Sequence, residues 1–460
     1  MFRKILIANR GEIAVRVIRA CKELGIGTVA VYSSADAESE HVRLADEAVH
    51  IGPAPSAGSY LNIPNIIGAA LRTGAEAVHP GYGFLSEDPY FAEICAEDGI
   101  TFIGPPPEVM EKVGDKAVAR RLMSEAGLPL LPGTTEPVPT LDRAHEIADE
   151  IGYPVIIKAA AGGGGRGISV VHRRADLRSA YQTTRAGAQA VFRNSDVYME
   201  RYLPGARHIE VQVVCDAHGG AVHLGERDCS VQRRHQKLIE EAPSPSVDPE
   251  LRERIGEAAV RGARAVGYQG AGTMEFLLDD EGRFWFMEMN ARIQVEHPVT
   301  EMVTGVDLIQ EQIRVAAGLP LSVGQSDVHL TGHAIECRVN AEDPERDFAP
   351  APGRLEHLVW PGGPWTRVDT HCRPGDRVPP HYDSMIAKLI VWGRDRDTAL
   401  ARMERALGEL RAEGPGLRTT VPFHRKVLAH PEFRKGTHTT AFLQTAFLSD
   451  RTAGGAGAGP

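Results

Sequence analysis

The sequence predicts an α/β domain with an open parallel sheet at the N-terminus, followed by an α+β region of mixed strands and helices. In the first 113 residues, short apolar runs alternate with helical stretches, which is the pattern of parallel β-α-β units. Between residues 211 and 290, strand-like runs have the spacing of antiparallel strands. The chain of 460 residues is long enough for several domains with their own cores.

The N-terminal domain is expected to span residues 1–113. Strands are predicted at 5–8, 28–32, 75–78 and 101–103. Helices are predicted at 11–24 and 63–71. The turn after the first strand, Ala8-Asn9-Arg10-Gly11-Glu12, lacks the glycine spacing of a dinucleotide site, so no dinucleotide is expected there.

Two further regions follow. Residues 114–330 are expected to form one region, with a compact lid of alternating helices and strands at about 131–203. Residues 331–447 are expected to form a C-terminal mixed domain that ends near a charged helix at about 398–413. The tail, 448–460, is expected to be disordered, because its Gly- and Ala-rich end from residue 452 cannot bury apolar area in a core.

The composition limits the class of protein. A formal net charge of -10 argues against a general binder of nucleic acid or of anionic membranes. The six cysteines are scattered without a Cys-x-x-Cys pair, which favours reduced thiols over a disulfide framework or a zinc site. No apolar run approaches the roughly 20 residues of a membrane span, and no signal peptide is recognisable. We therefore expect a cytoplasmic enzyme that binds neither nucleic acid nor membrane.

An acidic hairpin carries the main chemical signal. Two strand-like runs flank a polar turn at 279–282, and side chains alternate faces along a strand. Glu288 and Asn290 are therefore expected on one face, opposite Glu275. The side chains expected to face the core are those of Trp285, Met287 and Met289. Carboxylate and amide oxygens on one face suit Mg²⁺ with bound phosphates. Arg292 and Glu296 follow and are interpreted as an anion clamp and a base, which predicts a phosphoryl-transfer site.

A run of four glycines, 162–165, lies between two predicted strands and is framed by Lys158 and Arg166. The run is not a Walker loop, because no Gly-Lys-Ser/Thr sequence opens a helix after it. Such a hairpin can fold over phosphates and donate backbone N–H groups, with Lys158 as a point charge. The alternative is a flexible hairpin tip.

Four other segments are weak signals when taken singly. They are Lys116 at the start of a helix, Glu200 to Leu203 at the end of a strand, the cations between Arg233 and Lys237, and the Pro/Gly loop 79–85. A solvated surface is the alternative for the cations, and an ordinary turn or loop for the others. Beside a carboxylate–metal site, the cations would balance the charge of ATP and of a second anion.

Together these residues resemble the biotin carboxylase family of ATP-grasp enzymes, over nearly the whole chain up to about residue 447. The motifs that carry the resemblance are Ala8-Asn9-Arg10-Gly11-Glu12-Ile13-Ala14, His79-Pro80-Gly81-Tyr82-Gly83, Gly162-Gly163-Gly164-Gly165, Arg233-Arg234-His235-Gln236-Lys237, Glu288-Met289-Asn290 through Glu296-His297-Pro298, Glu336-Cys337-Arg338 and Tyr382-Asp383-Ser384-Met385. Ala161 and Ser169 depart from the family, which often has Gly and a basic residue there. The implied fold is an ATP-grasp fold with an N-terminal parallel-sheet domain, a small lid and a C-terminal mixed domain.

The resemblance implies a nucleotide and metal site. ATP would lie between the lid and the C-terminal half of the grasp. The residues implied for ATP are Lys116, Lys158, Gly164, Gly165, Glu200, Arg201, Tyr202, Leu203, His208, His235, Glu275 and Glu288. The residues implied for Mg²⁺ or Mn²⁺ are Glu275, Glu288 and Asn290.

The resemblance also implies two further substrates. Bicarbonate would be bound by Lys237, Arg292, Gln294 and Val295. Glu296 would act as the base while bicarbonate attacks the γ-phosphate to give carboxyphosphate, which would decompose to CO₂ and phosphate. The phosphate would then take the ureido proton of biotin. The biotin pocket would be lined by Tyr82, Gly83 and Arg338, of which Arg338 would stabilise the biotin enolate.

Biotin is expected to arrive on a separate biotin carboxyl carrier protein. The carrier domain of such enzymes presents a lysine between two methionines, and none of the ten methionines here adjoins a lysine. No room for that domain is expected after residue 447. A carboxyltransferase subunit is the second expected partner. A homodimer is expected too, with Arg16, Arg19 and Glu23 as candidate surface residues; a solvated helix face is the alternative.

The expected function is therefore ATP- and bicarbonate-dependent carboxylation of carrier-bound biotin, as the first half-reaction of an acyl-CoA carboxylase such as the acetyl-CoA carboxylase of fatty acid biosynthesis. One alternative is the biotin carboxylase subunit of a pyruvate carboxylase. Another is a different carboxyphosphate-forming ATP-grasp ligase, against which the Arg338 region and the Tyr82 loop argue. The third is an inactive homologue that scaffolds a carboxylase complex, which the intact acidic set disfavours.

Overall fold

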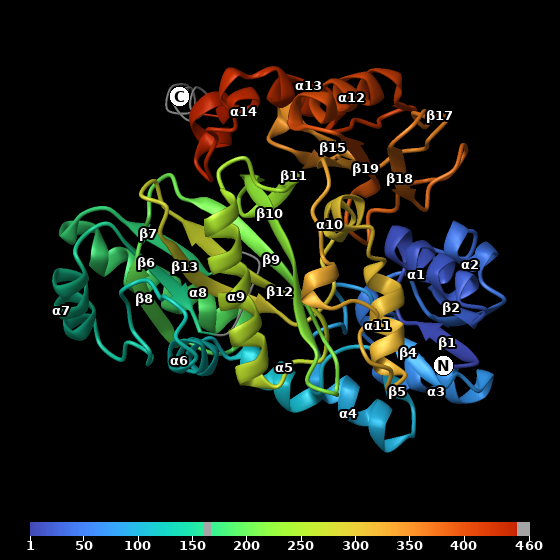
Figure 1. The fold of residues 1–460 in the computed structure, drawn as a ribbon, viewed down its shortest axis with the longest axis horizontal. Helices are drawn as coiled ribbons and strands as arrows, with labels where there is room; N and C mark the ends of the chain where they lie inside the picture. Colours follow the sequence, from blue (N-terminus) through green and yellow to red (C-terminus); the bar gives the residue numbers. More distant parts are fainter. Residues whose placement is uncertain (161–166, 449–460) are drawn as a thin grey trace, which may run out of the picture.

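The computed structural model describes residues 1–160 and 167–448. In this part of the chain, a parallel five-stranded sheet, a long antiparallel eight-stranded sheet and a small three-stranded sheet account for most of the strands. Figure 1 shows the N-terminal sheet at one end, the small sheet at the other, and the long sheet between them. The predicted combination of an open parallel sheet with mixed α+β regions is confirmed.

The N-terminal sheet has the strand order β3-β2-β1-β4-β5, and all its paired strands are parallel. Its strands are β1 (Lys4–Ile7), β2 (Gly27–Ser33), β3 (Glu47–Gly52), β4 (Ala77–His79) and β5 (Thr101–Phe102). Its helices are α1 (Gly11–Glu23), α2 (Glu40–Leu44), α3 (Ile63–Thr73) and α4 (Pro89–Glu97). The order reverses between β1 and β4, and ligands of open α/β sheets bind at such a switch point. The loops at residues 8–12 and 80–83 both begin there.

The small sheet forms a lid with the order β7-β6-β8. Its elements are α7 (Leu141–Ile151), β6 (Val155–Ala159), β7 (Ile168–Val171), α8 (Leu177–Phe192) and β8 (Val197–Arg201). Helices α5 (Pro107–Gly114) and α6 (Lys116–Glu125) lead to it from the N-terminal domain. The glycine run 162–165 and Ala161 lie outside the described residues. Ser169 is described, and its hydroxyl oxygen accepts a hydrogen bond of 2.7 Å from Thr184.

The long sheet has the order β13-β12-β9-β10-β11-β14-β19-β18. Its strands are β9 (Arg207–Cys215), β10 (Ala221–Arg233), β11 (Gln236–Ala242), β12 (Gly270–Leu278), β13 (Phe284–Asn290), β14 (His333–Asn340), β18 (Thr366–Thr370) and β19 (Met385–Gly393). Helix α9 (Pro249–Val266) packs on β9 and β10, whereas α10 (His297–Thr304) packs on β10 and β14. Helix α11 (Leu308–Ala316) packs on α1 and β12. The sheet continues across residue 330, and the domain boundaries themselves stay predictions.

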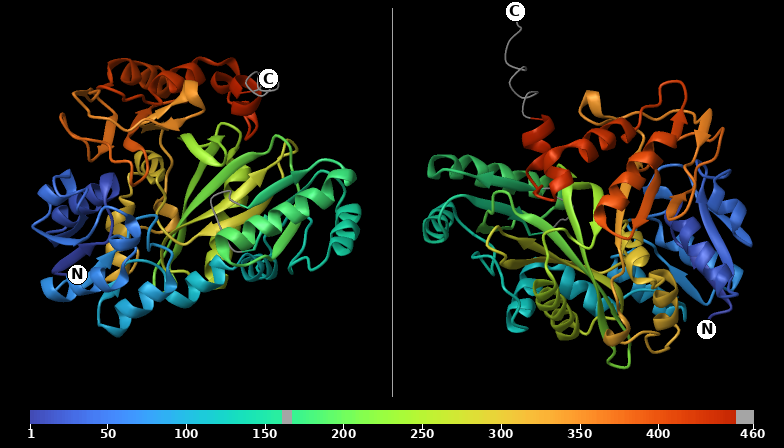
Figure 2. Two further views of the ribbon diagram at one scale, coloured as in Figure 1. Left: turned by 180° about the vertical axis from the view of Figure 1, so that it is seen from behind. Right: turned by 45° about the horizontal axis from the view of Figure 1, so that its top comes forward.

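The C-terminal region covers the upper end of this sheet, as the two views of Figure 2 show. Its helices are α12 (Arg396–Glu409), α13 (Val421–Ala429) and α14 (Pro431–Lys435). Its short strands are β15 (Glu342–Asp343), β16 (Ala349–Pro350), β17 (His357–Val359) and β20 (Arg411–Glu413). The helix predicted at 398–413 was too long, because the backbone of Leu410 is extended and the next residues pair with β17 instead.

The acidic hairpin β12–β13 contains a bulge that the alternation rule did not foresee. Glu275 pairs with Glu288, as predicted, but the register shifts immediately afterwards so that Phe276 pairs with Phe286. The residues of β13 in the core are therefore Phe284, Phe286 and Met289. The prediction that Trp285 and Met287 face the core was wrong: both are half-buried, and Met287 lines the cleft described below. The extra residue of a bulge reverses the faces of the residues before it.

All six cysteines belong to the described residues and are buried free thiols, as predicted. Among the helices that the structure describes, none is both long and apolar enough to cross a membrane.

Candidate active site

A large cleft of about 1720 Å³ lies between the lid, the long sheet, the 80–83 loop and the C-terminal region. The predicted site residues that line it are Tyr82, Gly83, Lys116, Lys158, Glu200, Arg201, Tyr202, Leu203, His208, His235, Lys237, Glu275, Glu288, Asn290, Arg292, Gln294, Val295 and Arg338. Glu296 is fully buried directly behind the wall of the cleft. The remaining two, Gly164 and Gly165, lie outside the described residues. The structure therefore gathers every described residue of the predicted set around one cavity.

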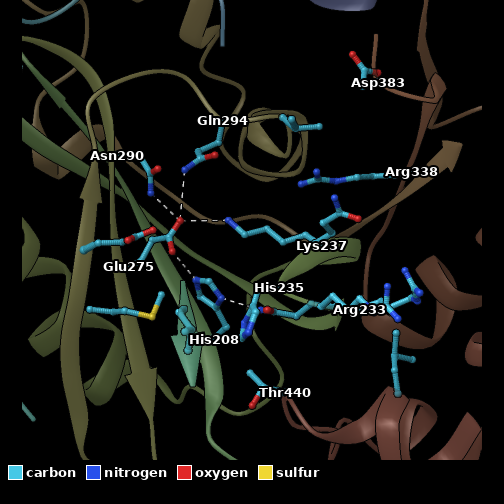
Figure 3. Close-up of a pocket in the computed structure, with 18 of the residues that line it drawn as sticks. His208, Arg233, His235, Lys237, Glu275, Asn290, Gln294, Arg338, Asp383 and Thr440 are labelled. Atoms are coloured by element: carbon cyan, nitrogen blue, oxygen red, sulfur yellow. Dashed lines mark hydrogen bonds and ion pairs between the residues drawn. The ribbon is translucent and has the colours of Figure 1, made fainter. Parts of the chain in front are cut away.

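Glu275 is the centre of the hydrogen-bond network in this cleft (Figure 3). Its Oε1 accepts from Asn290 Nδ2 at 2.7 Å, from Lys237 Nζ at 3.2 Å and from Gln294 Nε2 at 3.4 Å. Its Oε2 lies 2.8 Å from Nε2 of His208. These partners come from β9, β11, β13 and the loop after β13, so one carboxylate joins side chains from four places in the sequence.

Lys237 connects three buried carboxylates. Its ammonium donates to Glu210, to Glu275 and, at 2.7 Å, to Glu296. Burial alone would lower the pKa of Lys237, but the three carboxylates outweigh burial and raise it. Burial alone would raise the pKa of Glu296, but the charges of Lys237 and then Arg338 outweigh it and lower that pKa. Glu296 is therefore ionised at neutral pH, the form in which a carboxylate can accept a proton.

His208 is held as an imidazolium by the same cluster. Burial lowers the pKa of the ring, but Glu275 at 2.8 Å and Glu210 at 3.3 Å outweigh burial and raise it to about 10. Unfolded histidine titrates near pH ~6.5. Because the folded-state pKa is the higher one, this stabilisation is complete below pH ~6.5 and is lost as the pH rises towards 10.

Replacing His208 with glutamine should therefore flatten the pH dependence of stability. We expect the free energy of unfolding of the original protein to fall more steeply between pH ~6.5 and ~9.5 than that of H208Q. Urea unfolding across this range measures the difference. The exposed His381 provides the control, since H381Q should leave the steep dependence in place. If the free energy of unfolding fell equally steeply with pH in H208Q and in the original protein, the assignment of an imidazolium to His208 would be contradicted.

Glu275 and Glu288 face each other across β12 and β13 and fit a divalent cation. Burial, and then the charge of Glu275, raise the pKa of Glu288. Two carboxylates that oppose each other in this way repel unless a cation lies between them, and a hard-oxygen set with an amide suits Mg²⁺ or Mn²⁺. Asn290 supplies that amide beside them.

The loop after β13 positions Arg292. Its guanidinium donates to Glu87 Oε2 at 2.9 Å, to Gln294 Oε1 at 2.9 Å and to Asn290 Oδ1 at 3.3 Å. The backbone N–H of Ala291 donates to the other oxygen of Glu87, also at 2.9 Å. Glu87 thus fixes the start of this loop from the N-terminal domain.

Arg338 lies on β14, on the side of Glu296 opposite to Lys237. It donates to Glu296 Oε2 at 2.9 Å and to Glu240 Oε1 at 2.5 Å. Burial raises the pKa of Glu240 to about 7, although Arg338 opposes this shift. Lys237 and Arg338 therefore contact opposite oxygens of Glu296 and hold it between two cations.

On the lid side, Glu200 is the buried centre. It accepts from Lys158 at 2.5 Å and from Arg120 at 2.8 Å. Lys116 opens α6, whose N-terminus is capped by Asp115. Burial lowers the pKa of Lys116, although Glu288 opposes this shift. The two lysines thus lie close enough to Glu288 in the cleft for their charges to act on its carboxylate.

Several residues of this network were missed by sequence reasoning: Glu87, Arg120, Glu210 and Glu240. For Glu210 a signal existed, because His208, Glu210 and Gln212 alternate on one face of β9 and Glu210 pairs with Glu275. Glu87, Arg120 and Glu240 meet their partners only through the tertiary fold, and no local pattern marks them.

The helix predicted to carry a dimer surface is partly internal. Arg16 on α1 is buried and pairs with Glu301 at 2.9 Å and Asp307 at 2.7 Å of the same chain. Glu23 accepts from Gln310 at 2.8 Å. Arg19 and Glu23 are exposed, so these two remain accessible candidates.

Comparisons with protein families cover the chain in three segments. Residues 1–110 match the biotin carboxylase N-terminal domain, and residues 336–445 match the biotin carboxylase C-terminal domain. Between them, residues 115–323 match the ATP binding domain of the carbamoyl-phosphate synthase L chain.

Individual relatives are similar over almost their whole length. A biotin carboxylase of Nostoc sp. is 56% identical over 96% of this chain and 99% of its own. A pyruvate carboxylase subunit of Methanothermobacter thermautotrophicus is 54% identical over 96% of this chain and 90% of its own.

Solved structures agree with the fold. A Campylobacter jejuni biotin carboxylase in complex with β,γ-ATP matches with a TM-score of 0.94 and 48% identity, over 97% of this chain and 99% of that one. The biotin carboxylase domain dimer of Hydrogenobacter thermophilus 2-oxoglutarate carboxylase, with MgADP, ADP and bicarbonate, matches with a TM-score of 0.93 and 48% identity, over 97% of this chain and 98% of that one.

The fold and the cleft thus define an ATP-dependent ligase of the ATP-grasp class. Within that class, the two flanking domains and the identities above distinguish the carboxylases from the carbamoyl-phosphate synthases. The chain belongs to the biotin carboxylase family.

Proposed function

We propose that this chain carboxylates biotin on a separate carrier protein, with ATP and bicarbonate as its other substrates. The observation that carries the proposal is the position of Glu296, whose carboxylate is held between Lys237 and Arg338, directly behind the wall of the cleft that the opposed carboxylates Glu275 and Glu288 line. A base between two cations, beside a metal–nucleotide site, suits attack of a small anion on a phosphate.

The nucleotide would occupy the lid side of the cleft. Residues proposed to bind it are Lys116, Lys158, Gly164, Gly165, Glu200, Arg201, Tyr202, Leu203, His208, His235, Glu275 and Glu288. Glu275, Glu288 and Asn290 would hold Mg²⁺ or Mn²⁺, which neutralises charge on the phosphate oxygens when bound. Closure of the lid would keep water away from the reacting phosphate.

Bicarbonate would bind where Lys237 and Arg292 converge with the backbone of Gln294 and Val295. Glu296 would accept the proton of bicarbonate while a bicarbonate oxygen bonds to the γ-phosphorus and ADP leaves. The product of this step is carboxyphosphate. Its decomposition yields CO₂ and a phosphate, and the phosphate would take the ureido proton of biotin. Arg338 would stabilise the negative ureido oxygen, in a pocket lined by Tyr82 and Gly83.

Biotin carboxyl carrier protein and a carboxyltransferase would be the partners, and the dimer of the Hydrogenobacter thermophilus domain supports a homodimer here. We favour an acyl-CoA carboxylase, with acetyl-CoA or propionyl-CoA as acceptor. Pyruvate carboxylase is the second candidate, because the Methanothermobacter thermautotrophicus relative belongs to such an enzyme.

The test is a hydrolysis assay. With Mg²⁺, we expect ATP hydrolysis that requires bicarbonate and is stimulated by free biotin, because both substrates reach the same cleft. Release of phosphate with and without each substrate measures this, and omission of Mg²⁺ is the control. A rate of hydrolysis that does not change when biotin is added would contradict the proposed function and favour another ATP-grasp ligase. Absence of all hydrolysis would favour an inactive homologue.

A further inference from the structure

Lys388, on β19, is a fully buried lysine that does not line the cleft. Its ammonium donates to the backbone carbonyl of Val295 at 2.9 Å and lies 3.1 Å from Oε1 of Glu12. A buried ammonium is costly unless it is paired and hydrogen-bonded. One charged centre therefore ties the loop after β13 to the first turn of α1.

The same carboxylate reaches the 80–83 loop. Glu12 is only 4% exposed, and its Oε1 also accepts a hydrogen bond from the hydroxyl of Tyr82. The amide of Asn9 donates to the carbonyls of Pro80 and Tyr82 at 2.7 and 2.8 Å. Both the hydroxyl and the backbone of Tyr82 are thus held by the segment that follows β1.

The position of the Val295 carbonyl matters for the base. This carbonyl belongs to the planar peptide unit that joins Val295 to Glu296. Its contact with Lys388 therefore fixes the direction in which the chain enters Glu296 and α10. Glu87 holds the start of this loop at Ala291 and Arg292. Lys388 holds its other end, at Val295.

We propose that Lys388 and Glu12 are positioning residues, which keep the bicarbonate loop (residues 291–296) and Tyr82 at a fixed separation through one buried ion pair. The inference rests on the proposed function, since it assigns bicarbonate to the loop and biotin to the side of Tyr82. Neither residue touches a substrate, because neither lines the cleft. Loss of the pair would loosen both pockets together and leave the lid side of the nucleotide site unaltered.

The test uses E12Q, K388M and the double variant, which carries no unpaired charge from this pair. We expect the KM for bicarbonate and the KM for free biotin to rise together, each about tenfold, or about 1.4 kcal/mol. The Kd for ATP should stay within about twofold, because distant sites are nearly independent. Residues that act as one unit are not additive, so the double variant should resemble the single ones.

The matched control is E40Q. Glu40 on α2 pairs with Arg373 at 3.0 Å, which also links the N-terminal domain to the C-terminal region, and neither residue lines the cleft. E40Q should change neither KM. A purely structural role for Lys388 and Glu12 would lower the melting temperature of their variants with both KM values unchanged, and that result would overturn the inference.

A measurement on the original protein covers the case in which a variant does not fold. Free biotin alone should slow amide hydrogen exchange in the 291–296 loop, because Tyr82 and Val295 share the Glu12–Lys388 pair. Unchanged exchange at saturating biotin would contradict the link. If the original protein lacks bicarbonate-dependent ATP hydrolysis, the proposed function fails, and that result is distinct from an active protein whose variants show unchanged KM values.

Discussion

Replacing Arg338 with alanine should abolish biotin carboxylation while ATP still binds. Arg338 is the proposed cation at the ureido oxygen, and removing one donor of this kind costs about 10²–10³ in rate. Its side chain bonds to Glu240 and Glu296 and to none of the lid residues around Glu200, so the Kd for ATP should stay within about twofold. Formation of carboxybiotin measures the first quantity, and titration with ATP the second.

Arg338 also pairs with Glu240 and Glu296, so the variant needs a stability control. The free energy of unfolding should be compared with that of R425A, which removes an exposed arginine from α13. R425A should retain full carboxylation. A large loss of ATP binding in a folded R338A would contradict the role given to Arg338.

Replacing Lys237 with methionine should have the largest effect on bicarbonate-dependent ATP hydrolysis. Its ammonium contacts Glu210, Glu275 and Glu296, and the variant leaves these three carboxylates without it. Their mutual repulsion would raise the pKa of Glu296, so the base would be partly protonated at neutral pH. With the bicarbonate cation lost as well, we expect a fall in rate of about 10³.

The same variant should lose stability in a pH-dependent way. Removing one partner of a buried charge network costs roughly 3 kcal/mol or more. Because the carboxylates would then have raised pKa values in the folded state, the loss should shrink as the pH falls and they are protonated. Urea unfolding at pH ~8 and ~5.5 measures it, and K435M, at an exposed lysine of α14, is the control. A loss of equal size at both pH values would speak against a carboxylate origin.

Local patterns predicted much of the fold. Four of the five strands of the parallel sheet and the elements of the lid follow from apolar runs and helical periodicity, and they proved correct to within a few residues, whereas β3 was not predicted. The β13 bulge escaped the alternation rule, because a single inserted residue leaves no trace in the apolar pattern. The long helix α9 and the strand β19 were also not predicted.

The residues of the site likewise divide into those that a local pattern places together and those that only the tertiary fold brings together. Glu275, Glu288 and Asn290 could be placed together from the sequence because they lie on two neighbouring strands of one hairpin, although the bulge shifts the register that the turn alone would give. Glu87 was not found, since it lies more than 200 residues from Arg292 in the sequence. The ion pair between Lys388 and Glu12 was not predicted for the same reason, since its two residues are far apart in the sequence.

By itself the sequence determined which chemical groups the protein has and, outside the β13 bulge, on which faces of its hairpins they lie, because alternation and turn chemistry are local properties. Only the tertiary structure decided which charges meet. Lys237, Glu210 and Glu296 come from β11, β9 and the start of α10, and their pKa values depend on distance and burial. The proposed base is ionised because the fold places two cations against it, and no segment of the chain encodes that alone.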